Sequence, residues 1–175
     1  MELSKQQALW VLRAQCHDRE ALELLLGSVQ ASLRRYLAGV VGPADADDVL
    51  QEVLVLAFRK LHWLHKAELF RPWLFRIASR AAFRHLKKER RRSAQEDEFA
   101  MLETVQPPSE ELLQQLAVIE TISPASRAVL VLHFQEEMSL PEVAAVLEIP
   151  LGTVKSRLAY GLTSLRKHLG NTRRL

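Results

Sequence analysis

The sequence predicts an all-α protein: two small helical domains joined by a flexible linker, with a helix-turn-helix as the C-terminal domain. Glycine is scarce, with six in 175 residues, whereas the helix-favouring Leu, Ala, Glu, Arg and Gln are abundant. No stretch alternates apolar and polar β-branched residues as a half-buried strand would. Apolar residues instead recur every three or four positions, in segments that end at helix-terminating residues.

Three helix patterns predict a first domain over residues 1–92. The first pattern covers residues 18–37 and is followed by a Gly-Pro pair. The second begins with Asp45 as its N-cap and carries a broad apolar stripe as far as Leu64. The third covers residues 72–92, starts with a proline in its first turn and becomes increasingly basic.

A change in composition separates this domain from the next. Residues 93–108 contain four acidic residues and no Lys or Arg, and they end in two prolines, which predicts an acidic linker. The second domain is expected over residues 109–175. Within it, Ser139 caps a short helix, and a tight connection at residues 148–150 leads to a helix over residues 151–168. This is the arrangement of a helix-turn-helix.

Charge is distributed unevenly along the chain, although the net charge is only +3. Residues 59–92 carry 12 Lys or Arg and 2 acidic residues, whereas residues 93–122 carry no Lys or Arg and 7 acidic residues. The basic block could serve nucleic-acid phosphates, or the two blocks could be solvated helix faces that balance each other.

Several classes of site and location are not expected. The single cysteine, Cys16, excludes an internal disulfide, and no His or Cys residues cluster at metal-ligand spacing. Without paired carboxylates near a His or a glycine-rich phosphate loop, we expect no catalytic residues and no cofactor. The N-terminus lacks a secretion signal, and no apolar run approaches the roughly 20 residues that span a bilayer. We therefore expect a cytoplasmic protein without membrane insertion.

The final predicted helix has a polar side that could meet DNA. Its apolar side carries Val154, Leu158, Leu162 and Leu165, and Gly161 would allow close helix contact. The polar side and its flanks display the candidate DNA-binding residues Thr153, Lys155, Ser156, Arg157, Tyr160, Thr163 and Lys167. These side chains can hydrogen-bond to phosphates and base edges, although an amphipathic helix in a bundle would look similar.

Two segments of the chain resemble one protein family. Residues 138–169, above all IPLGTVKSR at residues 149–157, closely resemble the region-four helix-turn-helix of extracytoplasmic-function (ECF) sigma factors. DADDVLQEV at residues 45–53, followed by PWLFRIA at residues 72–78, resembles region two of the same family. The resemblance implies a sigma factor that binds core RNA polymerase and promoter DNA, with an anti-sigma factor as a further partner. It also assigns the polar face of the last helix to the −35 element.

The resemblance implies a polymerase-binding face on the second predicted helix. The matching positions are Asp48, Gln51 and Glu52, and helical spacing adds Val55 to the same face, opposite the apolar stripe. Carboxylates around an apolar contact suit a protein interface. A solvated acidic helix face is the alternative.

The resemblance also implies contacts between the basic third helix and the −10 promoter element. Binding opened DNA needs cations for phosphates and aromatic faces for bases. The candidates are Lys66, Arg71, Phe75, Arg76, Arg80, Arg84, Lys87 and Lys88. Trp63 is among the aromatic residues that interleave with the cations, whereas Trp73 is expected to be buried. The loop at residues 65–70 corresponds to the family loop that captures a flipped base.

The sequence departs from the family pattern at four positions. Arg80 and Arg84 stand where the family commonly has Asn and Asp, Leu54 replaces a common aromatic residue, and Tyr160 replaces a common Arg. The preferred promoter sequence is therefore not predicted. A stand-alone helix-turn-helix regulator is the alternative function, but the two region-two segments argue against it.

Overall fold

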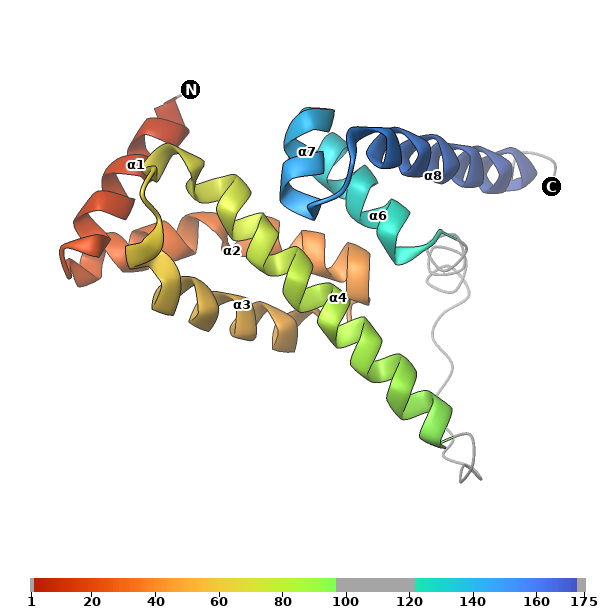
Figure 1. Cartoon of the computed structure of the whole chain (residues 1–175), viewed down its shortest axis with the longest axis horizontal. Coiled ribbons are helices and arrows are strands. Elements are labelled where there is room, and N and C mark those ends of the chain that lie inside the picture. Colours follow the sequence, from red (N-terminus) through yellow and green to blue (C-terminus); the bar gives the residue numbers. More distant parts are fainter. Residues whose placement is uncertain (1, 97–121, 173–175) are drawn as a thin grey trace.

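The computed structural model describes residues 2–96 and 122–172, and every regular element within these ranges is helical. In chain order (Figure 1) they are α1 (Glu2–Gln15), α2 (Arg19–Val41), α3 (Ala46–Lys60), the 3₁₀ turns η1 (Leu61–Trp63) and η2 (Ala67–Leu69), α4 (Phe70–Glu96), α6 (Pro124–Leu130), the π-helical turn η3 (Val131–Gln135), α7 (Leu140–Leu147) and α8 (Leu151–Thr172). The all-α prediction is confirmed.

Helix α4 is longer than the sequence predicts at both ends. It begins at Phe70, inside the expected loop, and continues to Glu96 because no Gly or Pro interrupts the chain there. The first four residues of the predicted linker are thus helical. Residues 97–108 of the predicted linker, and the start of the predicted second domain, lie outside the described residues.

Helix α1 was not predicted, and it completes the N-terminal unit (residues 2–96). Its inner side is built from Val11, which is fully buried, from the buried Gln7, and from the partly buried Ala8, Trp10 and Ala14. Leu9 and Leu12 are more than half exposed and obscure the helical period. The buried Gln7 donates a hydrogen bond to Ser28 Oγ at 3.1 Å, which ties α1 to α2.

Gln15, at the end of α1, holds the turn that follows α3. Its Nε2 group donates to the carbonyl oxygens of Leu61 and Leu64, each at 2.9 Å. Because both protons of one amide group are used, the backbone of η1 is fixed from outside its own segment. Leu61 and Leu64 are buried, and Trp63 points outward between them with an exposure of 67%.

A buried polar contact at the centre of the N-terminal unit joins α2 to α4. The Ser79 hydroxyl donates to the Phe75 carbonyl at 2.7 Å and lies 2.6 Å from the Tyr36 hydroxyl. The rings of Tyr36 and Phe75 meet edge to face, with centroids 5.4 Å apart. Burial raises the pKa of Tyr36 above its ordinary range. Phe75 is therefore a core residue with no exposed surface, and its predicted contact with DNA is wrong for this structure.

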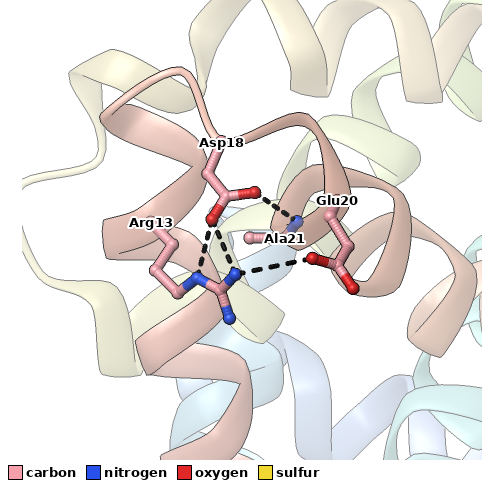
Figure 2. Close-up of polar contacts among 4 residues, drawn as sticks. All are labelled: Arg13, Asp18, Glu20 and Ala21. Atoms are coloured by element: carbon pink, nitrogen blue, oxygen red, sulfur yellow. Dashed lines mark hydrogen bonds and ion pairs between the residues drawn. The ribbon is translucent and has the colours of Figure 1, made fainter.

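Asp18 joins α1 to α2 by capping α2 and binding a cation of α1 (Figure 2). Its Oδ1 atom accepts the Ala21 N–H at 3.0 Å, and its Oδ2 atom accepts Arg13 Nε at 2.7 Å. Arg13 also lies 3.8 Å from Glu20. Two hydrogen bonds hold the pKa of Asp18 below its ordinary value: the larger effect comes from the Ala21 backbone N–H, and the next from the Arg13 side chain.

The predicted helix-turn-helix is confirmed in the C-terminal unit (residues 122–172). Ser139 and Glu142 form a reciprocal capping box at the start of α7. Glu148 ends α7 in the left-handed conformation, with φ 56°, which turns the chain into α8. Gly161 lets α8 approach α6, because a Cβ atom there would lie 2.8 Å from Leu130 Cδ1.

The two units pack against each other, and one continuous set of buried residues runs through both. Figure 1 shows α6, α7 and α8 together on one side of α2 and α4; α6 contacts α2, and α7 contacts α4. A Cβ atom on Gly39 of α2 would lie 3.0 Å from Val131 Cγ2 in the other unit. The basic helix α4 is thus in contact with the helix-turn-helix.

Replacing Asp18 by Asn tests how far the charge of this cap stabilises the fold. The Asn oxygen can still accept the Ala21 N–H, but the attraction to Arg13 is lost. Since the folded pKa of Asp18 is lowered, the stability that its charge contributes is present above the ordinary value of 3.8 and is lost as the pH falls through the folded pKa. We expect the unchanged protein to have the higher Tm at neutral pH, and the two Tm values to converge in acid.

Thermal unfolding followed by circular dichroism at a series of pH values measures this difference. Asp18→Ala, which also removes the acceptor, should keep a Tm deficit at every pH. A Tm deficit of Asp18→Asn that persists unchanged into acid would show that the charge is not its cause.

Candidate protein and nucleic-acid interfaces

The outer face of α3 brings together the four residues predicted to bind polymerase. Asp48, Gln51, Glu52 and Val55 are all exposed, and the opposite side of the helix is buried in the core. Phe58, three residues beyond Val55, extends the face with a ring that is 59% exposed. We call these five residues the α3 face. Phe58 was not among the predicted polymerase-binding residues, although its helical spacing from Val55 is the signal that identifies it.

Ion pairs connect the α3 face to α4. A carboxylate oxygen of Glu52 accepts a hydrogen bond from the Arg84 guanidinium. Asp45, at the start of α3, makes no capping hydrogen bond with its side chain, and instead lies 3.2 Å from His85 Nε2. Arg84 was predicted to contact DNA and Glu52 to contact polymerase, so the two candidate interfaces meet at this pair.

The exposed side of α4 carries a line of cations, which we call the α4 stripe: Arg76, Arg80, Arg84, Lys87 and Lys88. The three arginines are four residues apart and therefore lie above one another on the helix. Towards the C-terminal end of α4, a hollow of about 550 Å³ is lined by Arg84, Lys87, Lys88, Arg91 and Arg92. A surface lined only by cations attracts phosphates.

Two of the predicted DNA-binding arginines are engaged by carboxylates of the C-terminal unit. Arg80 binds Glu148 through two hydrogen bonds, and Arg71 binds the buried Glu136 at 2.5 Å. Arg76 is half-buried, and its Nε atom has no hydrogen-bond partner among the described residues. Lys66, Lys87 and Lys88 are exposed.

Among the aromatic residues that the structure describes, Trp63 is the most exposed. Trp73, expected to be buried, is half-buried and lies against Phe70 with ring centroids 6.0 Å apart. Trp63 is 67% exposed, with its ring 4.8 Å from that of His62. Its position on η1, whose backbone Gln15 fixes, makes Trp63 the aromatic surface that could stack on an unpaired base.

The polar face of α8 is open along its length. Lys155, Ser156, Tyr160, Thr163 and Lys167 are exposed, whereas Thr153 and Arg157 are half-buried. The Ser156 hydroxyl donates to the Thr153 carbonyl at 3.0 Å and the Thr163 hydroxyl to the Ala159 carbonyl at 2.9 Å, so both hydroxyl oxygens remain available as acceptors. Val154 is fully buried, which fixes the rotation of the helix.

No group of three or more His, Cys, Asp or Glu side chains is arranged to hold a metal ion within residues 2–96 and 122–172. No helix in the same ranges is long and apolar enough to cross a membrane.

Comparisons with known proteins match both units. The family model for Sigma-70 region 2 matches residues 24–92, and that for Sigma-70, region 4 matches residues 118–167. The ECF RNA polymerase sigma-E factor of Escherichia coli K12 is 30% identical over 164 residues, covering 85% of this chain and 86% of that protein. The ECF RNA polymerase sigma-E factor of Haemophilus influenzae is 30% identical over 168 residues, covering 87% and 88%.

Solved structures agree with this family. CnrH in complex with the cytosolic domain of CnrY has a TM-score of 0.72 at 25% identity, covering 95% of this chain and 98% of that chain. The sigma factor RpoE from Bartonella quintana, in complex with the anti-sigma factor NepR, shares the fold, with a TM-score of 0.69 at 23% identity over 85% and 96% of the two chains. Together these matches show that the chain belongs to the sigma-70 family and, within it, to the ECF RNA polymerase sigma factors.

Proposed function

We propose that this chain binds core RNA polymerase and directs it to specific promoters through three separate surfaces. The observation that carries the proposal is that one chain combines a region-two unit, with an acidic and apolar face beside a basic stripe, and a region-four helix-turn-helix. A stand-alone regulator would not need the region-two unit, and we do not favour that alternative.

The α3 face is proposed to bind polymerase. Val55 and Phe58 offer exposed apolar surface, 49% and 59% respectively, and Asp48 and Glu52 surround it with negative charge. An apolar centre within a charged rim is typical of protein interfaces, in which the charges set orientation. Arg84 helps to orient Glu52 from the side of α4.

The α4 stripe and Trp63 are proposed to bind the −10 element. The cations would hold phosphates, and the exposed ring of Trp63 would stack on an unpaired base. Lys66 and the turn at residues 65–70 lie next to Trp63 in the sequence and would contribute to the same contact. Phe75 is left out of this surface because it is buried.

Helix α8 is proposed to bind the −35 element in the major groove. Ser156 and Tyr160 lie at the centre of the polar face and would contact base edges, while Lys155 and Arg157 lie nearer its flanks and would contact phosphates. Gly152, in the first turn, is exposed with no atom near its Cβ position, so DNA could approach the N-terminus of the helix closely.

Two further properties are proposed by analogy with the family. Sigma factors are DNA-binding initiation factors, so we propose that this chain has no catalytic activity of its own. The Bartonella quintana sigma factor RpoE is bound to an anti-sigma factor in its solved structure. We propose that an anti-sigma factor also binds this chain.

Reversing two charges on the α3 face tests the function. Asp48→Lys with Glu52→Lys should weaken association with core polymerase about a hundredfold or more, because like charges at an interface cost several kcal/mol. The measurements are pull-down of core enzyme and mapping of transcript starts on fragmented genomic DNA. The unchanged chain should produce starts that share −10 and −35 sequences, and the double variant should lose them.

Glu20→Lys with Glu23→Lys makes the same charge change at exposed positions on α2 and serves as the control. It should bind polymerase like the unchanged chain. Normal binding by the Asp48, Glu52 variant would refute the α3 face, and promoter-specific regulation by the chain without polymerase would favour the stand-alone regulator.

The proposed roles on α8 can be separated by two substitutions. Lys155→Ala should reduce the use of all promoters and lower the salt dependence of DNA binding by about one unit, because a phosphate contact carries no sequence information. Tyr160→Arg should change which −35 sequences are preferred, because a base contact discriminates by roughly 1–3 kcal/mol at particular positions. Transcription from a library with a randomised −35 element, using each mutant holoenzyme, measures both effects. If Lys155→Ala alters the preferred sequence and Tyr160→Arg does not, the two roles are reversed.

A further inference from the structure

We infer that the C-terminal half of α4 carries a binding site for a nucleoside polyphosphate, formed by two adjoining hollows. One hollow has apolar walls that fit a base, and the other is lined by cations that fit a short chain of phosphates. This small-molecule site is a further property of the chain, beyond the proposed contacts with polymerase and promoter DNA.

The first hollow lies between the C-terminal half of α4 and the start of α6 (Figure 1) and has a volume of about 540 Å³. We call it the apolar hollow, after four half-buried residues that line it: Phe83, Leu86, Pro124 and Ala125. Phe83 and Leu86 also pack against the core, which holds their side chains in place. The volume lies within the range of roughly 300–1,000 Å³ typical of small-molecule sites, and the Phe83 ring offers a surface on which a base can stack.

The second hollow, of about 550 Å³, is lined by cations of α4, and we call it the basic hollow. Lys87 and Arg91, one helical turn apart, line both hollows and form the ridge between them. Around the helix, Phe83 lies on one side of this pair and Lys88 on the other. A ligand with its apolar part in the apolar hollow can therefore place its charged part in the basic hollow.

Four exposed cations at these hollows have no carboxylate partner among the described residues. No ion pair joins them to an acidic side chain within residues 2–96 and 122–172; they are Lys87, Lys88, Arg90 and Arg91. By contrast, the arginines at positions 71, 80 and 84 of the same helix each bind a glutamate. Like charges one turn apart on a helix repel one another, so a bound anion would relieve a repulsion that these residues otherwise retain.

The number and spacing of these charges indicate the class of ligand. A fatty acid carries a single charge and would leave most of the cations unmatched. A peptide spreads its carboxylates along a chain that extends by about 3.3 Å per residue, and a DNA strand places a sugar between successive phosphates. A nucleoside polyphosphate joins several negative charges directly to one another and to one flat base, and both Arg and Lys bind phosphate well. It therefore matches a compact group of cations beside a single apolar hollow.

Isothermal titration calorimetry of the free chain with ATP, adenosine and inorganic tripolyphosphate tests both hollows. ATP should bind one to one and about tenfold more tightly than tripolyphosphate, because stacking of the base adds to the attraction between phosphates and cations. Adenosine should bind more weakly than either. Equal affinities for ATP and tripolyphosphate, or no binding of ATP, would overturn the inference. Polymerase and promoter DNA are absent, so the result is independent of whether the chain directs transcription.

Reversing the two shared cations tests the position of the site. Lys87→Glu with Arg91→Glu should weaken ATP binding about a hundredfold, because both hollows lose a cation and gain a repelling carboxylate. Arg35→Glu with Lys60→Glu is the matched control, because it makes the same charge change at exposed positions on α2 and α3 that line neither hollow. An equal loss of ATP binding in both variants would attribute the binding to net charge and overturn the inference.

Ala125→Phe tests the apolar hollow alone. The added ring would occupy the space that the base needs, so the affinity for ATP should fall to that for tripolyphosphate, whose own binding should not change. Circular dichroism checks that the variant is folded, and if it is not, the comparison of ATP with tripolyphosphate on the unchanged chain decides. An undiminished preference for ATP in folded Ala125→Phe would overturn the placement of the base.

Two other occupants are distinguished by further titrations. The tetranucleotide dApdApdApdA should bind about tenfold more weakly than ATP, and equal or tighter binding would assign the hollows to a DNA strand. The chain's own acidic residues next to α4 are the other occupant: Glu96, Asp97, Glu98 and Glu103. The unchanged chain should bind ATP. If ATP binds only after these four residues are replaced by Gln, the hollows belong to the chain's own segment and the inference fails.

Discussion

The complete burial of one side of α4 is the constraint on which the rest of the structure depends. This side carries five fully buried residues: Leu74, Phe75, Ala78, Ala81 and Ala82. The small alanine side chains allow α2 and α3 to pack closely on it. The charged residues of α4 must therefore lie on the remaining surface. Contacts from α3 and from the C-terminal unit, and the proposed contacts with promoter DNA, therefore all involve the same few cations.

Shared cations make the candidate interfaces depend on one another. Arg84 joins the α4 stripe to Glu52 on the α3 face, and Arg80 joins it to Glu148 in the helix-turn-helix. Exposed pairs of this kind stabilise the protein little, so phosphates can displace them at low cost. The Arg71 to Glu136 pair differs, because separating a buried carboxylate from its cation costs several kcal/mol unless water or another group replaces the arginine.

Much of this architecture could be predicted from the sequence, because large apolar residues at helical spacing mark α2, α3, α4, α7 and α8. Helix α1 escaped prediction because the exposed Leu9 and Leu12 interrupt the helical period of its inner side, which includes small residues and the buried Gln7. The assignment of Phe75 to DNA failed because aromatic residues interleaved with cations do not reveal which of them face the core. The partners of Arg71 and Arg80 lie 65 and 68 residues away, and no local pattern connects positions so far apart.

The packing of the two units against each other is tested most directly by a distance measured between them. Spin labels at Gln30 of α2 and Ala159 of α8, both exposed, report that distance once Cys16, the native cysteine, is replaced by Ser. Pulsed electron-electron double resonance on the free chain should give one narrow distribution of distances, because the two units share one set of buried residues. A broad distribution of distances in the free chain would contradict the packing of the two units.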